Sequence, residues 1–543
     1  MPTQEQKKEK ILTILAALVI IAYLTVFTVI GFWGFARLCT SDMYEDTLVA
    51  RLMWEQKTLF PKNYLFGNQF YVAATPVLAA LFYGLTGSMN HGMAWATLCM
   101  SVFLLASMDW MLRACVKRRS VRLVTMMVFM ASIFGPYSVF REDGQQLFFA
   151  MCSFYACYLI CFFVVLGDWL RAGRSEARRP VSFAAALILC FCTGMQSLRQ
   201  TCVLILPLLA FEALVALRRV SKKQPLFPAA VYGRLRRVLG YTLANSLGLL
   251  FIRLLPVKRH EIYGGASVFS GASMREKLLE AHRAVLTVTG YEAARQGQNR
   301  LFFVLMFLAT TLLVLTAVFL LLKRRRKPDG AGALWLITVI GCLAVIAASF
   351  VTSVRLRPIY LFLYYTLPAL SLALIGEKAK PRLLSGLMAG LCLLSAANLY
   401  FSYKDDLSVV FDPAPTAAEQ IADWAVEHGY TLVYGSQSMS APAVAACADG
   451  KLTAGCWQDD YLFKVSPLIN IRDIYHIEDY RRAVFVFTAP EVPGMLGETA
   501  ANGVEMTEHG QYGFYRLYTA SQQCMWPVTE LIDYAERFPE YNY

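Results

Sequence analysis

Long apolar runs are the feature of this sequence that most limits how the chain can fold. The first run, residues 11–36, has no charged side chain in 26 positions, so it is long enough to cross a bilayer and too long for the apolar core of a secretion signal. Eleven further runs of roughly 20 residues follow: 68–86, 90–112, 122–140, 145–166, 181–197, 201–217, 238–255, 301–322, 333–352, 358–376 and 383–401. With 57% hydrophobic residues and a mean hydropathy of +0.46, the chain is predicted to be a polytopic α-helical membrane protein, and a string of soluble domains is excluded.

The basic loops predict which runs cross the membrane, because cytoplasmic loops carry an excess of Lys and Arg. If all twelve runs crossed, starting from a Lys-rich cytoplasmic N-terminus, the basic loop 113–122 would face outward. Placing run 68–86, which contains Pro76, along the outer surface puts every dense basic loop inside: 113–122, 171–179, 218–237, 323–327 and 378–382. We therefore predict eleven spans in the plasma membrane, a cytoplasmic N-terminus, large outer loops at 37–89 and 256–300, and an outer C-terminal domain.

The net charge of +13 divides sharply along the chain. Residues 1–402 hold 43 Lys and Arg against 18 Asp and Glu, whereas residues 403–543 hold 8 against 20. The basic residues therefore belong to membrane topology and the acidic ones to a separate solvated domain, so we expect no nucleic-acid partner.

Residues 403–543 are predicted to form a small extracytoplasmic α/β domain. A helix over 416–428 begins with Thr416 and Glu419 at capping-box spacing and ends at Gly429. Strands are predicted at "TLVYG", at the β-type run "RAVFVFTAP" and at a final pair, with a further helix over 438–449. The domain contains no glycine-rich phosphate loop and no nucleophile elbow.

Charged residues gather at the predicted outer ends of the spans. Asp42 lies about one turn beyond the first span. Two further acids and three arginines lie in outer turns or at span ends: Glu142, Asp143, Arg199, Arg355 and Arg357. A solvated loop carboxylate is the ordinary explanation for any one of these acids. Acids and bases converging at one membrane face favour a site for an anionic lipid head group.

The segment "SDMYEDTLVARLMWEQKTLFP" resembles the first outer loop of the GT-C glycosyltransferases, membrane enzymes that take sugars from polyprenyl-phosphate donors. Its pattern is similar to that loop in lipid A aminoarabinose transferases and protein O-mannosyltransferases. Asp42 falls where their catalytic Asp stands, Met53 matches a family Met, and Pro61 closes the loop. The usual Glu after the catalytic Asp is absent, and Glu45 or Asp46 is the candidate to replace it.

Weaker similarities continue along residues 1–402 in the family's order. A surface helix follows the first loop in that family, as predicted independently for 68–86. The segments "FREDGQQ", "GMQSLRQTCVLILP" and "RLRPIY" resemble its second acidic turn and two later motifs, and an outer C-terminal domain completes the order. The resemblance implies a GT-C-like membrane domain of about 11 helices.

The resemblance implies an inverting transfer of a hexose or pentose to a cell-envelope glycan, a lipid or a protein. Asp42 is the expected general base, with Glu142 or Asp143 as a second catalytic acid group. The expected substrate contacts are the phosphate-binding guanidinium groups and the polar residues of the first loop: Arg199, Arg355, Arg357, Glu45, Asp46 and Tyr64. No cofactor or dedicated metal is required, although Asp42 and Asp143 together could hold a divalent cation.

Two other functions fit a chain of this composition. A secondary transporter or lipid flippase tends to show internal repeats and broken spans that meet at the membrane midplane. We find no clear repeat, and the charged groups collect at one face, which favours the enzyme. The other alternative is a protein of GT-C shape that is inactive and acts as a scaffold for envelope assembly.

Overall fold

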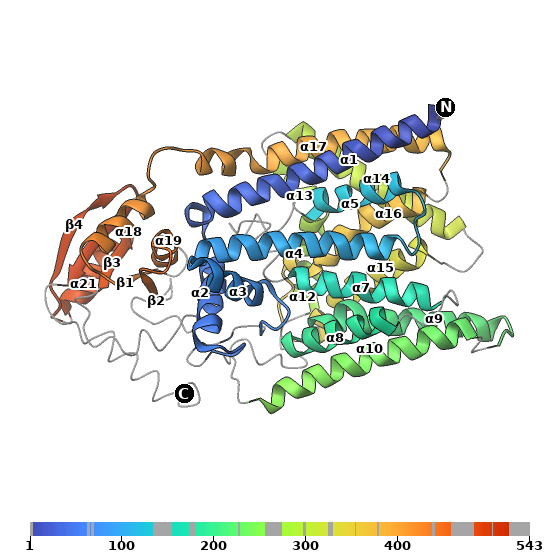
Figure 1. The fold of residues 1–543 in the computed structure, drawn as a ribbon, viewed down its shortest axis with the longest axis horizontal. Helices are drawn as coiled ribbons and strands as arrows, with labels where there is room; N and C mark the ends of the chain where they lie inside the picture. The colour runs from blue at the N-terminus through green and yellow to red at the C-terminus, as the bar shows by residue number, and fades with distance from the viewer. Residues whose placement is uncertain are drawn as a thin grey trace.

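The computed structural model describes residues 4–61, 64, 66, 70–133, 155–173, 180–225, 229–255, 274–296, 300–323, 330–352, 354–376, 379–436, 440–457, 483–501 and 503–520. A bundle of long helices makes up most of the molecule, and a small domain containing a β-sheet lies at one end of it (Figure 1). The N-terminus lies at the opposite end of the bundle from this domain. That arrangement agrees with an odd number of membrane crossings between them.

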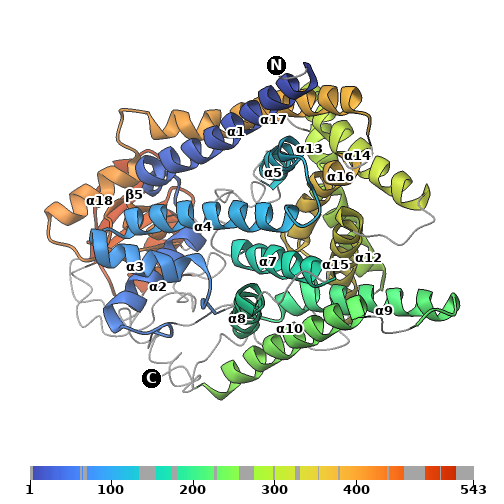
Figure 2. The same ribbon diagram turned by 45° about the vertical axis from the view of Figure 1, so that its right-hand side comes forward.

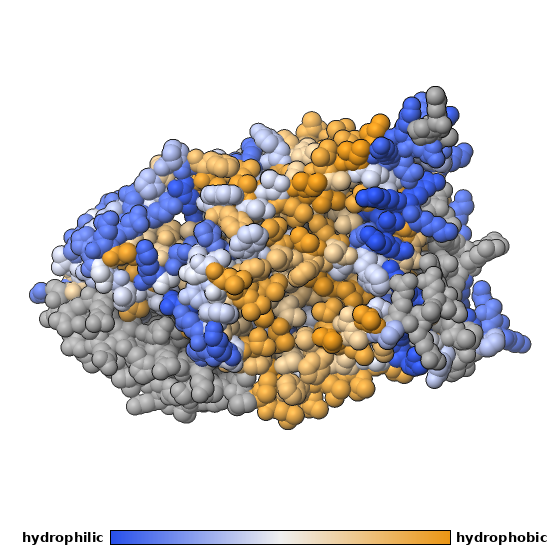
Figure 3. All heavy atoms as spheres, in the orientation of Figure 1, coloured by the Kyte–Doolittle hydropathy of each residue, from blue (hydrophilic) through white to orange (hydrophobic). Residues whose placement is uncertain are grey.

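Among the described residues, seven helical segments are long and apolar enough to cross a membrane. They are α1 with the π-helix η1 (Gln4–Gly34), α4 (Met89–Leu112), η4 with α9 (Thr201–Ser221), α14 (Arg300–Lys323), α15 (Ala331–Val351), η5 with α16 (Pro358–Gly376) and α17 (Pro381–Val410). Four more helices occupy predicted spans: α5 (Arg119–Ile133), α7 (Ala156–Ala172), α8 (Pro180–Gln196) and α10 (Ala229–Leu254). Figure 3 shows apolar side chains in a broad belt around the middle of the bundle, with hydrophilic side chains at both ends. A multi-span membrane fold is therefore confirmed.

The helix α3 (Thr75–Thr86) occupies the run that was predicted to lie along the surface. Its 12 residues extend about 18 Å, whereas the hydrocarbon core is about 30 Å thick. It packs against α4 and against α2 (Ser41–Gln56). Gly84 makes the contact with α2 possible, since a Cβ there would lie 2.2 Å from the ring of Trp54. The short helix is consistent with a position outside the set of spans.

Buried ion pairs join four helices at the end of the bundle that holds the N-terminus. Asp168 on α7 accepts hydrogen bonds from Ser182 (2.6 Å), Arg237 (2.5 Å) and Tyr241. The next residue contributes too: the Trp169 indole N–H donates to Glu212 on α9, and Arg234 on α10 lies 3.0 Å from the same carboxylate. Each acid is almost fully buried, so its charge needs these partners. The pairs fasten α8, α9 and α10 to α7.

The C-terminal domain has a five-stranded sheet with the order β2-β1-β3-β5-β4. The strands are β1 (Leu432–Ser436), β2 (Thr453–Trp457), β3 (Ala483–Thr488), β4 (Met506–Tyr512) and β5 (Tyr515–Ala520). Strand β1 pairs in parallel with β2 and β3, whereas β5 pairs antiparallel with β3 and β4. The central β3 is buried along its whole length, as its uninterrupted apolar sequence requires. The predicted small α/β domain is thus present.

Among the described residues, three helices accompany this sheet: α18 (Ala417–Glu427), α19 (Ala441–Cys447) and α21 (Val492–Ala501). The capping box at the start of α18 is formed as predicted, because the Thr416 hydroxyl accepts from the Glu419 backbone and the Glu419 carboxylate accepts from the Thr416 backbone. The membrane helix α17 runs through the predicted boundary at residue 402 and ends at Val410.

Candidate active site

The helix α2 carries the first acidic cluster and begins directly where the chain leaves the first span. After η1, the chain makes the short 3₁₀ helix η2 (Ala36–Leu38) and reaches Thr40, whose extended backbone precedes the first turn of α2. Asp42 lies in that first turn, where the helix dipole stabilises a negative charge. The helix ends at Lys57, which adopts a left-handed conformation and places its ammonium 3.4 Å from the centre of the Trp54 ring.

Three of the four acids of α2 occupy adjacent positions on one helix face. Asp42, Glu45 and Asp46 are spaced at i, i+3 and i+4, so their side chains are neighbours. Asp42 and Glu45 are partly exposed, whereas Asp46 is only 1% exposed. Apolar residues of the same helix are buried around these acids: Met43, Leu48, Val49 and Leu52.

Two buried tyrosines lie against these carboxylates. Burial raises the pKa of the Tyr64 phenol well above its usual range, and the charges of Glu45, Asp46 and Asp42 raise this pKa further. Burial likewise raises the pKa of Tyr71, with added effects from the Asp46 charge and from a side-chain hydrogen bond to Asp46. Both tyrosines therefore stay protonated and can donate hydrogen bonds. The structure brings together four residues that the sequence singled out: Asp42, Glu45, Asp46 and Tyr64.

Gln196, the last residue of α8, holds the chain segment that contains Tyr71. Its side-chain oxygen accepts hydrogen bonds from the backbone N–H groups of Val72 (3.3 Å) and Ala73 (2.6 Å). Its backbone carbonyl accepts a third from Phe70 at 3.2 Å. Since Gln196 is fully buried, these bonds are shielded from water and position the first loop firmly against α8.

Arg199 lies three residues beyond Gln196 and is surrounded by aromatic rings. Its guanidinium carbon is 4.9 Å from the centre of the Tyr155 ring, 5.3 Å from that of Tyr158 and 5.7 Å from that of Tyr360. These are favourable cation–π distances. Arg357 also acts electrostatically on the Tyr155 hydroxyl. Two of the three predicted phosphate-binding arginines therefore lie near one tyrosine.

A cavity of about 510 Å³ adjoins this arginine pair, between α12 (Met274–Val288) and the segment 355–358. Its charged lining consists of three cations and one acid: Arg283, Arg355, Arg357 and Glu280. Arg355 makes a 3.3 Å ion pair with Glu280, and the Leu356 N–H donates to the same carboxylate at 3.4 Å. The remaining excess of positive charge suits an anion with several oxygen atoms, such as a phosphate.

Contacts connect the acidic face of α2 with this cavity in a continuous series. Asp46 acts electrostatically on Tyr71, and Gln196 holds the backbone on both sides of Tyr71. The next turn of the chain carries Arg199, whose guanidinium lies over the ring of Tyr155. Arg357, which lines the cavity, acts electrostatically on the same tyrosine. The acidic face of α2 and the arginine-lined cavity thus belong to one region of the bundle.

Sequence reasoning missed several residues of this region. Gln196 ends an apolar run three positions before Arg199, which was a usable signal. Tyr71 and Arg283 gave none, because their roles depend on which distant segments pack against them. The two predicted acids of the second outer turn, Glu142 and Asp143, lie outside the described residues. Within the part of the chain that the structure describes, no group of three or more His, Cys, Asp or Glu side chains could hold a metal ion.

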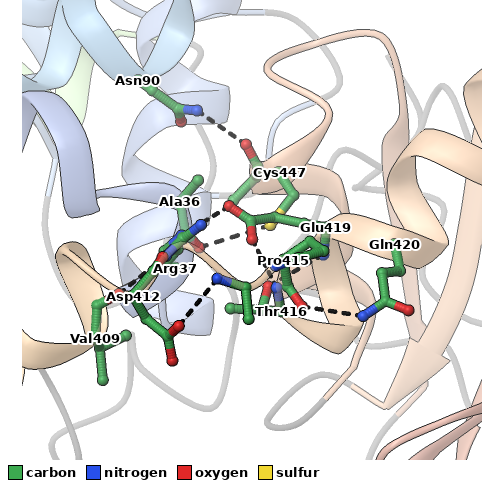
Figure 4. A network of polar contacts seen from close by, with 12 residues as sticks. Ala36, Arg37, Asn90, Val409, Asp412, Pro415, Thr416, Glu419, Gln420 and Cys447 are labelled. Carbon is green, nitrogen blue, oxygen red and sulfur yellow. Dashed lines mark hydrogen bonds and ion pairs between the residues drawn. The ribbon is translucent and has the colours of Figure 1, made fainter.

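A polar network, which Figure 4 shows, fastens the C-terminal domain to η2 just before α2 and to the start of α4. Arg37 makes a 2.8 Å ion pair with Glu419 on α18 and donates to the backbone carbonyl of Asp412 at 2.6 Å. The Asn90 side chain, at the start of α4, donates to the carbonyl of Ala446 at 2.9 Å. The domain therefore contacts the two segments that border the site.

Two more contacts reach α2 itself. The backbone N–H of Ala454 on β2 donates to the Tyr44 hydroxyl at 2.9 Å, and Tyr44 is buried between two of the acids in sequence. About two helical turns further on, Arg51 donates to the carbonyl of Gly450 at 3.2 Å. The position of the acidic helix therefore depends on the docked domain as well as on the bundle.

Comparison with known proteins shows the fold. The chain is similar to the crystal structure of ArnT from Cupriavidus metallidurans bound to undecaprenyl phosphate, with a TM-score of 0.53 and 12% identity over 93% of this chain and 97% of the other. The apo structure of the same ArnT gives a TM-score of 0.54 and 11% identity over 95% of this chain and 98% of the other. The chain has a GT-C fold. No family model matches it, and no curated protein matches it in sequence.

The GT-C fold extends over nearly the whole chain, including the C-terminal domain. The resemblance that rested on one loop and several weak motifs is thereby confirmed for the fold. At 11–12% identity, the similarity does not transfer an activity, so the function must be argued from this chain's own residues.

Proposed function

We propose that this protein is a membrane glycosyltransferase that moves a sugar from a polyprenyl-phosphate donor to an acceptor at the extracytoplasmic face. The observation that carries the proposal is the series of contacts joining the acids of α2 to a cavity lined by three arginines, within a GT-C fold. One relative of the same fold was solved with undecaprenyl phosphate bound. A base next to a phosphate site is what such a transfer requires.

The reaction is an inverting displacement at the anomeric carbon of the donor sugar. The acceptor hydroxyl attacks that carbon, its proton passes to the Asp42 carboxylate, and the bond from the carbon to the phosphate oxygen breaks with its electrons on the polyprenyl phosphate. General-base help of this kind contributes about 10² to 10⁴-fold in rate. Asp42 suits the role because it is partly exposed, so an acceptor can reach it.

The arginines bind the phosphate of the donor. Arg283, Arg355 and Arg357 line the cavity, and Arg199 stands beside it on its tyrosine cluster. The leaving phosphate is already an anion, so fixed guanidinium groups stabilise it without protonating it. Tyr64 and Tyr71 remain protonated beside the partly exposed Glu45 and the buried Asp46. The donor sugar is expected next to these residues.

The second carboxylate of the mechanism is assigned to Glu142 or Asp143. Asp42 with Asp143 is also the pair that could hold a divalent cation, since hard cations take carboxylate ligands. The steps above are written with this chain's own side chains. Calcium, magnesium or manganese added to the transfer assay measures whether such an ion contributes.

Donor consumption tests the proposal directly. The purified full-length protein is mixed with undecaprenyl-phosphate-linked hexoses or pentoses and with a membrane extract that supplies acceptors, and release of free undecaprenyl phosphate is measured. We expect release with at least one of these donors. Movement of a lipid-linked sugar across sealed vesicles with no release would instead identify a transporter or flippase.

The proposal also needs the C-terminal domain and α2 on the outer side, with the basic loops inside. A cysteine at the exposed Thr507 should react with an impermeant maleimide on intact cells, whereas one at Lys117 should react only after lysis. The native Cys447 gives little background, because burial raises the pKa of its thiol to about 12. Labelling of the Thr507→Cys variant only after lysis would overturn this topology.

A further inference from the structure

A second cavity, of about 570 Å³, lies at the end of the bundle opposite to α2, between α1, α4 and α5. The carboxyl end of α4 and the amino end of α5 meet there, close to the basic loop that joins them. Figure 3 shows hydrophilic side chains gathered at this end of the bundle, directly beside the apolar belt. None of the groups proposed for sugar transfer contributes to this cavity.

The lining of this cavity changes from apolar to cationic along its length. Its apolar part includes Val102 and Ala106 on α4, together with Leu24 on α1. Its charged part includes Arg113, which follows Val102 by 11 residues and so lies about 16 Å further along the helix axis. This length and this gradient match an amphiphile whose polar group faces the membrane surface.

Three arginines and one aspartate make up the charged part: Arg113, Arg119, Arg122 and Asp109. Asp109 pairs with Arg113 at 2.6 Å and with Arg122 at 3.2 Å, so it holds two guanidinium groups side by side. Arg119 is exposed and, among the described residues, has no hydrogen bond or ion pair from its side chain. The site keeps a net positive charge of two, which suits a phosphate monoanion or dianion.

The apolar part of the cavity opens toward the surrounding bilayer. Val102 is 46% exposed and Ala106 is also exposed, although both lie on a membrane-spanning helix. An acyl chain can therefore enter from the side while its head group reaches the arginines. Inorganic phosphate would use only the charged part.

We propose that this cavity binds an anionic phospholipid of the bilayer, with its phosphate on Arg113, Arg119 and Arg122 and an acyl chain along Val102 and Ala106. Asp109 orients two of the arginines and does not contact the lipid. The binding site is separate from the proposed donor site, so it can be tested whatever reaction the protein performs.

Native mass spectrometry of the full-length protein in detergent tests this proposal, with phosphatidylglycerol, phosphatidylcholine, undecaprenyl phosphate or inorganic phosphate added. Phosphatidylglycerol should bind more tightly than phosphatidylcholine. An arginine near a phosphate contributes about fivefold in affinity, so Arg119→Gln should weaken phosphatidylglycerol binding about fivefold. The Arg119 side chain makes no hydrogen bond or ion pair among the described residues and is exposed, so this variant should fold normally.

Two further variants distinguish binding of the head group from binding of the acyl chain. Ala106→Phe fills the apolar part and should weaken phosphatidylglycerol binding while leaving inorganic phosphate unaffected. The matched control Lys117→Gln/Arg118→Gln removes two exposed charges of the same loop that do not line the cavity, and it should change binding less than twofold.

Several results would overturn the proposal. Equal binding of both phospholipids, or equal loss in the Lys117→Gln/Arg118→Gln control, would mean that only the general surface charge matters. Inorganic phosphate binding as tightly as phosphatidylglycerol, with no effect of Ala106→Phe, would show a free-anion site. Tighter binding of undecaprenyl phosphate than of phosphatidylglycerol, lost in Arg119→Gln, would assign the cavity to the carrier lipid instead.

Discussion

The two ends of the helical bundle use buried acids in different ways. At the end that holds the N-terminus, Asp168 and Glu212 lie directly against arginines of α10, and these pairs join α7 and α9 to α10. At the other end, Asp46 lies against tyrosines, and three arginines line a separate cavity formed by α12 and residues 355–358. Acid and base are joined in the first case, whereas in the second they are kept apart and linked through intervening residues.

This difference distinguishes acids that stabilise the fold from acids that are available to a substrate. A carboxylate that is neutralised by a neighbouring arginine is committed to holding helices together, because removing either partner leaves a buried charge. Carboxylates held beside protonated tyrosines, with the cations at a distance, leave both kinds of charge able to engage a substrate. The comparison therefore predicts loss of activity from changes at one end and loss of folding from changes at the other.

The largest effect is expected for Asp42→Asn, which removes the proposed base. Sugar transfer should fall by about 10² to 10⁴-fold, while the yield of folded protein stays the same. Glu55→Gln is the matched control on the same helix, since Glu55 is exposed and contacts Arg51 in an i,i+4 ion pair and the Tyr83 hydroxyl at 3.5 Å. Full transfer by the Asp42→Asn variant would remove Asp42 from the mechanism.

Asp168→Asn should act on folding. Breaking a buried ion pair costs about 3 to 5 kcal/mol, so the thermal unfolding midpoint and the folded yield should drop while the specific activity of the remaining folded protein is kept. Asp405→Asn, at a 79% exposed acid of α17, should change neither. The contrast between the ends would fail if Asp168→Asn left stability intact.

Arg283→Gln should weaken the binding of undecaprenyl phosphate. A hydrogen bond to a charged group contributes about 1.5 to 3 kcal/mol, which corresponds to about 10 to 150-fold in affinity. Arg355→Gln should have a smaller effect, because Arg355 is 77% exposed and already paired with Glu280. Equal affinity in wild type and Arg283→Gln, measured by titration of the reconstituted protein, would exclude the cavity as the phosphate site.

The smallest effect is expected for Tyr44→Phe, which leaves the Ala454 N–H without its acceptor. Docking of the C-terminal domain onto α2 should weaken by about 1 kcal/mol, seen as faster hydrogen exchange of β2 in the variant. Tyr430→Phe is the control, since its hydroxyl makes no hydrogen bond with any other described residue. Unchanged exchange in Tyr44→Phe would show that this bond does not hold the domain.

The sequence predicted the features that depend on local pattern. The run 301–322 is nearly the helix α14, and the capping box at Thr416 starts α18. The end of α17 was not predicted, because the charged residues after 402 suggested a boundary. The helix continues there since Tyr403 and Val410 are buried on one face, while the charges between them point outward.

For the candidate site too, the sequence predicted the residues that are neighbours along the chain and missed those that meet only in the fold. Asp42, Glu45 and Asp46 are helix neighbours, so one loop motif was enough to find them. Gln196 and the segment 70–73 meet although they are more than 100 residues apart in sequence, and Arg283 lies beside residues 355–358 only after the bundle has assembled. A single sequence carries no signal for such pairings.

The most direct test is a structure of the protein in lipid nanodiscs with undecaprenyl phosphate bound. The account predicts density for the phosphate in the cavity lined by Arg283, Arg355 and Arg357, at the end of the bundle that carries Asp42. Phosphate density that appears only at the other end, beside Arg113 and Arg122, would contradict it.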